Sequence, residues 1–265
     1  MLRNVFTKTL RDHWRAIAGW GLGLGLLTAF EIAVYPSIRD RAEEMNRLVA
    51  AYPEALRAMF GLEDFTSGAG FLTAELFSLV VPLVMVTIGI GFGARATAGE
   101  EERKTIDLLL ANPLPRRRLV TDNLLALAAA LAVVGLVLAA VLWAGATMLD
   151  MGVGIGGIAA ATGSSALLGL AFGAIALAVG CATGRRALAA AVAAALALAG
   201  WLVDSLAPLV EALEPWRKLS LFYQYLEHDP LRNGFDPANA AVLVAVAAVM
   251  ALVATVAFQR RDLAT

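Results

Sequence analysis

The sequence predicts an all-α polytopic membrane protein with six transmembrane helices, and three observations support this fold class. Of the 265 residues, 60% are hydrophobic, which exceeds the roughly 45 to 50% that is usual in soluble domains. Several apolar runs reach the roughly 18 residues that a helix needs to cross a bilayer. These runs are too continuous for the strands of a membrane barrel, and a helix satisfies its own backbone polar groups in lipid.

The predicted spans belong to a single transmembrane domain that covers residues 1–265. We place them at residues 16–35, 71–94, 124–148, 155–183, 187–203 and 238–258. The first two spans fall within 16–98 and are joined by a loop at 37–70. The next three fall within 119–203. Before, between and after these blocks we expect an interfacial helix at 1–15, a charged segment at 99–118, a segment of short helices at 204–237 and a tail at 259–265.

The amino-terminal stretch has an amphipathic pattern of its own. Leu2, Val5, Phe6, Leu10 and Trp14 fall near helical spacing, and four basic residues lie between them. This pattern is typical of a helix that lies on the inner leaflet of the membrane. The alternative is that these residues simply extend the first span into the cytoplasm.

The distribution of Lys and Arg predicts the orientation. The amino-terminal stretch, the segment at 99–118, the turn at Arg185 and Arg186 and the tail carry more basic residues than the alternate set of loops. Basic residues favour the cytoplasmic side. We therefore expect both termini in the cytoplasm and the chain in the cell membrane, in contact with membrane lipid. The net charge of −1 gives no basic field for nucleic acid.

The two longer loops on the opposite side are expected to contain short helices. Residues 37–70 combine charged side chains with a later apolar group, which predicts one or two amphipathic helices. Residues 204–237 mix prolines with aromatic residues and are too polar to span the bilayer. Short re-entrant or interfacial helices fit that composition best.

The segment GEEERKTIDLLLANPLPRRR, residues 99–118, is the most informative feature of the chain. Gly99 can begin a helix whose first turn contains Glu100, Glu101 and Glu102, where the helix dipole favours acidic groups, and Pro113 would end it. Ile106, Leu109 and Leu110 would share one face. That face could enter a groove of a cytoplasmic protein while the acidic turn meets basic residues there. Arg116, Arg117 and Arg118 would anchor the next span at the anionic inner surface.

The pattern alone also allows a solvated loop that has no partner. A resemblance to a known family favours the helix that contacts a partner over the solvated loop. The segment resembles the cytoplasmic motif of ABC-2 type permeases, the membrane subunits of ATP-binding-cassette exporters. The stretches at 52–65 and 219–234 are similar to members of that family as well. Lys104 departs from the motif, because the family often has Gly there. The matching positions are Glu100, Glu101, Glu102, Thr105, Asp107, Leu108, Leu109, Leu110, Pro113, Arg116, Arg117 and Arg118.

The resemblance implies a permease that works as a homodimer or heterodimer with two ATP-binding subunits. Residues 99–113 would be the coupling helix that contacts the ATPase. The sequence contains no G-x-x-x-x-G-K-[ST] loop, so ATP hydrolysis is expected in the partner chain, which would bind ATP and Mg²⁺. We expect no cofactor, metal or catalytic residue in this chain. The expected cargo is an exported hydrophobic or amphipathic small molecule, such as a drug or lipid.

Other residues suggest further roles. Glu31 and Glu75 are the only acidic residues within the predicted spans, and intramembrane carboxylates usually face a cavity or a partner, so both are candidates for cargo contact or an outer gate. Pro82 could kink the second span. Four glycine pairs have the G-x-x-x-G spacing of close helix packing, which is more often packing within one subunit than a dimer seam. They are Gly19 with Gly23, Gly21 with Gly25, Gly169 with Gly173, and Gly180 with Gly184.

Parts of the sequence are also compatible with two other functional classes. An intramembrane serine hydrolase would use Ser164 or Ser165 with His228. The other class is a passive channel or scaffold, which gives no reason for the segment at 99–118. The only cysteine, Cys181, excludes an internal disulfide.

Overall fold

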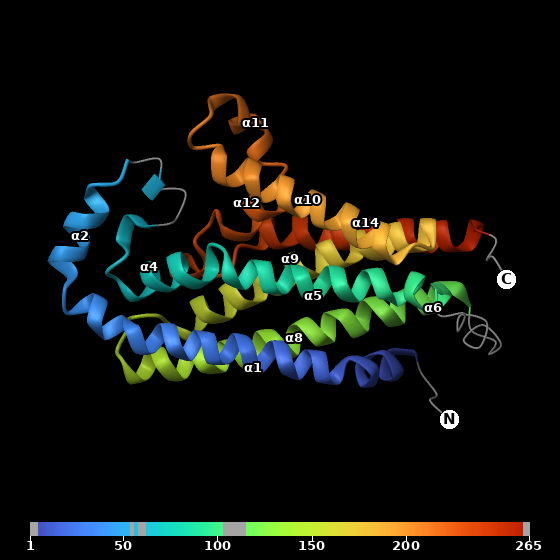
Figure 1. Ribbon diagram of the computed structural model, residues 1–265, viewed down its shortest axis with the longest axis horizontal. Coiled ribbons are helices and arrows are strands. Elements are labelled where there is room, and N and C mark those ends of the chain that lie inside the picture. Colours follow the sequence, from blue (N-terminus) through green and yellow to red (C-terminus); the bar gives the residue numbers. More distant parts are fainter. Residues whose placement is uncertain (1–4, 54–55, 58–61, 103–114, 262–265) are drawn as a thin grey trace.

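The computed structural model describes residues 5–53, 56–57, 62–102 and 115–261. Six of its helical segments are long and apolar enough to cross a membrane, which confirms the predicted fold class. Figure 1 shows them as a bundle of roughly parallel helices. The segments are α1 (Val5–Arg39), Gly68–Ala96, α8 (Arg116–Met148), α9 (Ile155–Thr183), α10 (Arg186–Leu206) and α14 (Pro237–Arg260).

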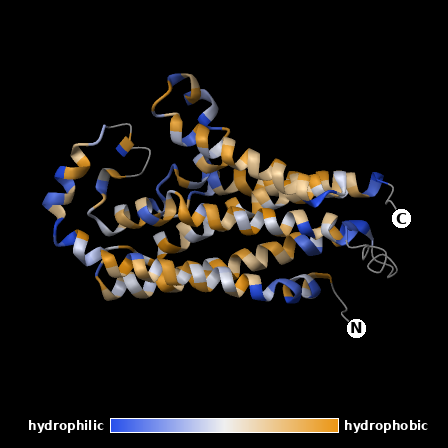
Figure 2. Ribbon diagram, in the orientation of Figure 1, coloured by the Kyte–Doolittle hydropathy of each residue, from blue (hydrophilic) through white to orange (hydrophobic). Residues whose placement is uncertain are grey.

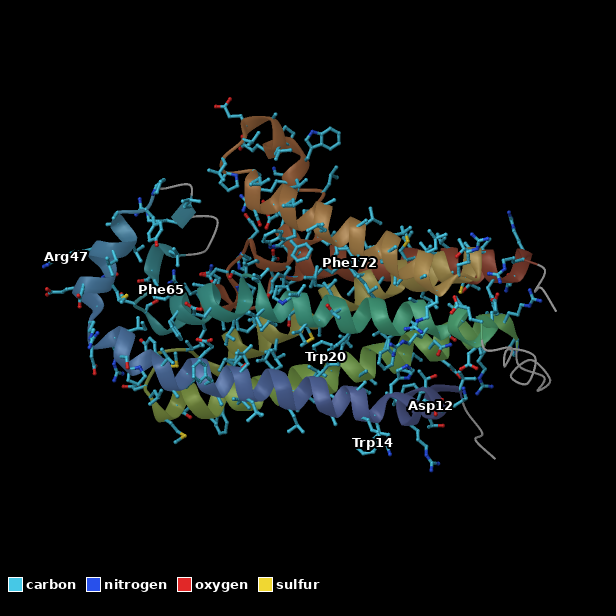
Figure 3. All side chains as sticks on the ribbon, viewed as in Figure 1. Asp12, Trp14, Trp20, Arg47, Phe65 and Phe172 are labelled. Carbon is cyan, nitrogen blue, oxygen red and sulfur yellow. The ribbon has the colours of Figure 1, made fainter. Side chains whose placement is uncertain are left out.

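Apolar residues fill the length of the bundle and charged residues collect at its two ends (Figure 2). The terminal end carries the beginning of α1, the end of α14 and the short helix α6 (Ala98–Glu102). The opposite end carries α2 (Ala42–Ala50), η1 (Leu62–Asp64), η3 (Glu211–Leu213), α11 (Glu214–Arg217), α12 (Leu221–Leu226) and α13 (Pro230–Asn233). In Figure 3, Asp12 and Trp14 mark the terminal end and Arg47 and Phe65 the opposite end.

The first span is longer than predicted. Within the described residues, α1 is one helix of 35 residues, about 52 Å long at a rise of 1.5 Å per residue. The described part has no break between the expected interfacial helix at 1–15 and the span at 16–35. The position of the first turns relative to the membrane stays a prediction. The only proline inside α1 is Pro36, so no proline forces a break near Arg15. Thr9 and Lys8 also tie its first turns to α8 and α6.

Two helices, α5 (Val80–Ala96) and α9, form the centre of the bundle. In the most apolar window of each of these two spans 61% of the residues are buried, against 17 to 39% in the other four spans. Glycine allows this close approach: a Cβ added at Gly89 would overlap the carbonyl oxygen of Gly169, and one at Gly93 would overlap that of Gly173. Of the four predicted glycine pairs, Gly169 and Gly173 therefore pack closely within this chain, whereas a Cβ at Gly19 or Gly23 would meet nothing within 4 Å.

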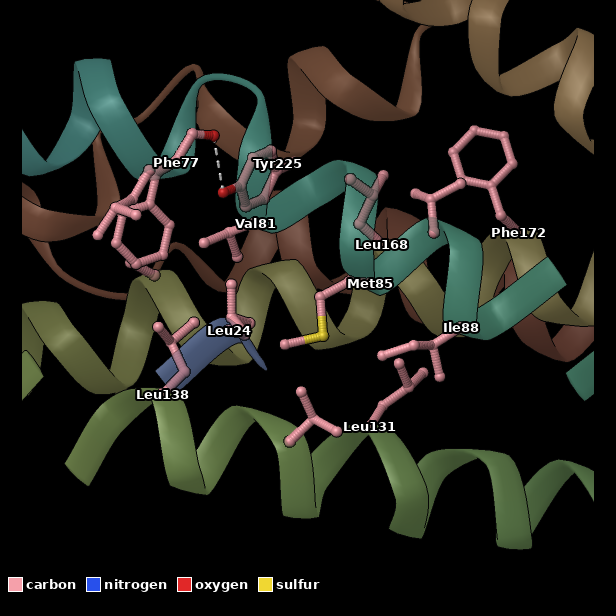
Figure 4. Packing of buried hydrophobic residues seen from close by; sticks show 14 of the residues in the cluster. Leu24, Phe77, Val81, Met85, Ile88, Leu131, Leu138, Leu168, Phe172 and Tyr225 are labelled. Carbon is pink, nitrogen blue, oxygen red and sulfur yellow. Dashed lines mark hydrogen bonds between the residues drawn. The ribbon is translucent and has the colours of Figure 1, made fainter. Parts of the chain in front are cut away.

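The second span is interrupted near one end. It consists of α4 (Gly68–Leu72), a π-helical turn at Thr73–Phe77 and α5. Pro82, predicted to kink this span, is the third residue of α5, so the irregularity precedes it. The reason is steric, because a proline ring in a continuous helix clashes with the carbonyl four residues earlier, which here belongs to Ser78. Close to this junction, Figure 4 shows Tyr225 hydrogen-bonded to Phe77, with Val81, Met85 and Leu138 packed beside them.

Candidate functional site

Three consecutive glutamates of α6 are bound to three different parts of the chain. The Glu100 carboxylate accepts a hydrogen bond from Lys8 Nζ of α1 at 3.1 Å. Glu101 forms an ion pair with Arg261, just beyond α14. Glu102 accepts a hydrogen bond of 2.9 Å from the backbone N–H of Arg186, the first residue of α10. A carboxylate there satisfies an orphan N–H and complements the helix dipole.

The ion pair between Glu101 and Arg261 is the most shielded of the three contacts. The two side chains are only 15% and 22% exposed, and Arg261 also donates a hydrogen bond of 2.9 Å to the backbone oxygen of Cys181 at the end of α9. Gly184 lies directly against the pair with a φ of +67°, and a Cβ at this position would clash with both charged groups. The pair therefore holds α6, α9 and the end of α14 together.

In this structure all three carboxylates contact groups of the same chain. The expected contact of the acidic turn with basic residues of a partner protein stays a prediction. The expected apolar face and the rest of the motif lie outside the described residues. These positions are Thr105, Ile106, Asp107, Leu109, Leu110 and Pro113. Their part in coupling remains a prediction.

The three arginines at the start of α8 differ in their contacts. Arg116 Nη1 donates hydrogen bonds of 2.8 and 2.9 Å to the carbonyl oxygens of Phe258 and Arg261, and its guanidinium lies 5.4 Å from the Phe258 ring centre. Arg116 therefore closes the carboxyl end of α14, where a cation is favoured by the helix dipole. The role of the three arginines as anchors at the inner membrane surface stays a prediction. Arg118 pairs with Asp122 at 3.9 Å, and Arg117 is exposed.

A polar cavity of about 300 Å³ lies beside α6 at the terminal end. Its lining includes Asp12, Arg15 and Arg95, together with the already paired Glu100 and Glu102. His13 lies at its wall with its ring 4.2 Å from the ring of Phe92. The cavity brings together residues of α1, α5, α6 and α10.

A second polar cavity, of about 400 Å³, lies at the opposite end of the bundle. Here we call it the loop-end cavity. Its lining contains two ion pairs: Arg217 with Asp204 at 3.0 Å, and Arg232 with Asp64 at 2.6 Å. Arg232 also approaches Asp229 at 3.5 Å. The lining comes from η1, α4, α10, α11, α12 and α13 and consists of Asp64, Gly70, Thr73, Ser78, Trp201, Asp204, Ser205, Pro208, Arg217, Phe222, Tyr225, Leu226, Glu227, Asp229 and Arg232.

Asp229 is the least satisfied charged group of this cavity. It has a φ of +47° at the start of α13, and its Oδ1 atom is buried without a hydrogen-bond partner. Burial raises the pKa of Asp229, while the nearby Arg232 guanidinium acts in the opposite direction. A carboxylate held in this way would be stabilised by an additional cation.

An apolar cavity of about 270 Å³ adjoins the loop-end cavity. It lies between α5 and α10, and we call it the apolar slot. Trp201 and Phe222 line both cavities. The slot is otherwise formed by Leu79, Leu83, Val86, Thr87, Ile90, Ala194, Ala197 and Leu198.

The two intramembrane carboxylates predicted as cargo contacts line neither of these cavities. Glu31 is partly buried on α1, and Glu75 is exposed in the π-helical turn. The two groups lie close enough to interact electrostatically. Their role in cargo contact or gating remains a prediction.

The residue pair that a serine hydrolase would need is not formed in the described part of the chain. Ser165 is buried and donates a hydrogen bond of 2.8 Å to the carbonyl of Thr162 in its own helix. His228 is exposed beyond α12, and its backbone oxygen accepts a hydrogen bond from Asn233. No hydrogen bond joins this histidine to either Ser164 or Ser165. The serines are thus explained by helix packing.

Sequence reasoning missed several of these residues. Lys8 and Arg261 were counted only as basic residues that set the orientation, and Arg217 and Arg232 only as charges on the other side. Asp229 and Trp201 were not singled out. The prolines and aromatic residues of 204–237 indicated packed short helices, but no sequence motif paired these residues with Asp64 or with α5.

The bundle of six membrane-length helices, with ionic contacts concentrated at its two ends, defines a polytopic membrane protein. The described residues contain no group of His, Cys, Asp and Glu that could hold a metal ion. The chain belongs to the ABC-2 family of transporter proteins, whose family model matches residues 3–263. This is the family that the charged segment resembles. The family predicted from the sequence is therefore confirmed. The comparison with curated proteins gives no match.

Membership assigns the chain a general role. Proteins of this family are the transport membrane subunits of ABC transporters, and they work with an ABC ATPase subunit. The chain is therefore a multi-pass membrane permease.

Proposed function

We propose that this permease exports a hydrophobic or amphipathic small molecule across the cell membrane, driven by ATP that a separate subunit hydrolyses. In this proposal the partner binds ATP and Mg²⁺, and two permease chains, identical or different, act together. Both termini, α6 and the segment that follows it lie in the cytoplasm, where the ATPase is available. The positive-inside pattern of the sequence supports that orientation.

The observation that carries the proposal is the three-way attachment of α6. Glu102, the last described residue before the segment 103–114, is bonded to the start of α10, while Glu101 and Glu100 are bonded to Arg261 and Lys8. A displacement of the segment by a partner would therefore pull on α1, α10 and the end of α14 at once, besides α5 and α8, to which it is joined in sequence. ATP-driven closure of the partner subunits would shift the population of permease states through these contacts.

A transport assay tests the proposal. The permease is reconstituted in vesicles with the ATPase subunit that copurifies with it, and a panel of apolar and amphipathic compounds is followed with and without ATP. Accumulation that requires ATP supports the exporter. Equal movement of compounds without ATP supports the channel alternative and would overturn the proposal.

A variant of the predicted apolar face and a control variant at the opposite end of the bundle test the coupling role. Replacing Ile106, Leu109 and Leu110 together by Asp should abolish ATP-dependent transport and copurification of the ATPase, because charges cannot enter an apolar groove without a large desolvation cost. Replacing Leu48, exposed on α2 at the opposite end, by Asp is the control and should leave transport unchanged. Normal transport in the triple variant would contradict the coupling role.

A further inference from the structure

The loop-end cavity and the apolar slot are adjacent parts of one chain with opposite chemistry. They meet at Trp201 of α10 and Phe222 of α12, which line both. The loop-end cavity is polar, has a volume of about 400 Å³ and is lined by ion pairs. The apolar slot has a volume of about 270 Å³ and lies between two spans. Each volume is near the lower end of the roughly 300 to 1,000 Å³ that is usual for small-molecule sites. A molecule that occupied both would need a polar end and an apolar body.

The charge of the loop-end cavity favours a ligand whose polar end is a cation. Four carboxylates line it, from Asp64, Asp204, Glu227 and Asp229, against two guanidinium groups. Both guanidiniums are already paired with carboxylates, and Glu227 interacts with the hydroxyl of Tyr223. The buried Oδ1 atom of Asp229 has no partner. The loop-end cavity thus has an excess of negative charge in its lining, which complements a cation and disfavours an anion.

The junction between the loop-end cavity and the apolar slot adds a second feature suited to a cation. Trp201 lines both cavities where they adjoin, and indole is the most favourable aromatic group for contact with an ammonium. Beyond it the slot is lined mainly by aliphatic side chains of α5 and α10. A hydrocarbon or aromatic body there would be removed from water, which is favourable in proportion to its apolar area.

We propose that the loop-end cavity and the apolar slot together bind a cationic amphiphile, with an ammonium head among Asp229, Asp204 and Trp201 and an apolar body between α5 and α10. This inference rests on the proposed export function and specifies its substrate class. A single-chain ammonium compound and a lipid with an ammonium headgroup share the chemistry. The excess of carboxylates over guanidinium groups in the lining disfavours an anionic amphiphile of the same length.

Equilibrium binding to the full-length chain in lipid nanodiscs tests the site without ATP. The probe is radiolabelled dodecyltrimethylammonium below its micelle concentration, and a neutral dodecyl glycoside and dodecyl sulfate are the comparison ligands. Asp229→Asn keeps the size of the side chain, and Asn tolerates the positive φ. We expect it to weaken binding of the cation about tenfold, as for the loss of one charged interaction, and to leave the neutral probe unchanged. If the unchanged protein and the Asp229→Asn variant bind the cation equally well, the ammonium head does not lie beside Asp229.

A second pair of variants tests the apolar body. Ala194 lines the slot and Ala195, its neighbour on α10, does not. Ala194→Phe should block the cation and the neutral probe alike, whereas Ala195→Phe should bind both as the unchanged protein does. If the two variants behave identically, the slot is not part of the site. Nanodiscs of phosphatidylglycerol with and without phosphatidylethanolamine distinguish the two sources of the ammonium group, because competition by the latter identifies a lipid occupant.

Transport measured separately keeps this inference distinct from the export proposal. Selective binding of the cation without ATP-dependent movement of any compound would contradict export but not the site. ATP-dependent transport of neutral compounds with no discrimination by charge would contradict the site and leave export standing.

Discussion

The hydroxyl of Tyr225 donates a hydrogen bond of 3.0 Å to the carbonyl oxygen of Phe77. The two residues are 148 positions apart in the sequence, and both are buried. Phe77 ends the π-helical turn that interrupts the second span, so the tyrosine satisfies a carbonyl where the regular helix is broken. It also fixes α12, one wall of the loop-end cavity, to the span that forms the apolar slot.

Tyr225→Phe is expected to destabilise the protein through this carbonyl. Leaving a buried acceptor without a donor costs about 1 to 3 kcal/mol. Thermal unfolding of the purified chain should show a lower midpoint temperature. Tyr52 is 54% exposed on the same end of the bundle, so Tyr52→Phe is the control and should unfold with the unchanged protein. Equal midpoints for both variants would show that the hydrogen bond contributes nothing measurable.

Gly89→Ala is expected to disrupt the contact between α5 and α9. The added methyl group would overlap the backbone of Gly169, and overpacking of this kind typically costs about 1 to 3 kcal/mol. Gly91 lies two residues away in the same helix with nothing within 4 Å of an added Cβ. Gly91→Ala should therefore be neutral or slightly stabilising, because alanine is the better helix former. The measurement is the unfolding midpoint, and a destabilised Gly91 variant would refute the packing argument.

The pair Glu101 and Arg261 is expected to behave as one unit in a double-mutant cycle. Each single change, Glu101→Gln or Arg261→Gln, leaves a poorly exposed charge without its partner, which costs up to roughly 3 kcal/mol for a well-shielded pair. The double variant should be less destabilised than the sum of the two single variants. Chemical unfolding of the four proteins gives the coupling free energy. Strict additivity would mean that the two side chains do not interact.

Gly184→Ala is expected to cost more than Gly152→Ala. Both glycines have a positive φ, +67° and +70°, so both substitutions carry the backbone strain of a left-handed residue, about 1 kcal/mol or more. Only at Gly184 would the new Cβ also meet Glu101 and Arg261, since Gly152 has nothing within 4 Å. The difference between the two unfolding free energies therefore measures the contact. A larger effect at Gly152 would be incompatible with it.

The long helices were predictable because length and hydropathy are local properties. The span at 155–183 agrees with α9 at both ends, and the fifth and sixth predictions fall within α10 and α14. Caps and turns explain this success: Gly184 ends α9, and Asp236 begins α14 by accepting a hydrogen bond from Ala238 N.

The pairings between distant residues were not predictable. Glu100 and Lys8 are 92 positions apart, and Glu101 and Arg261 are 160 apart, so no periodicity connects them. Likewise Gly169 and Gly173 were recognised as a packing pair, but their partners Gly89 and Gly93 were not. The hydrophobic pattern of α5 is nearly uniform around the helix, and it therefore gives no sign of which face meets α9.

The length of α1 allows a single helix to connect the two ends of the bundle. Its helix is unbroken from Val5 to Arg39, with Lys8 bound to Glu100 near one extremity and Arg39 bound to the backbone of Leu149 at the other. One continuous helix thus connects contacts near the two ends of the bundle. A displacement at one end would reach the other end through this helix, without passing through the glycine contacts between α5 and α9.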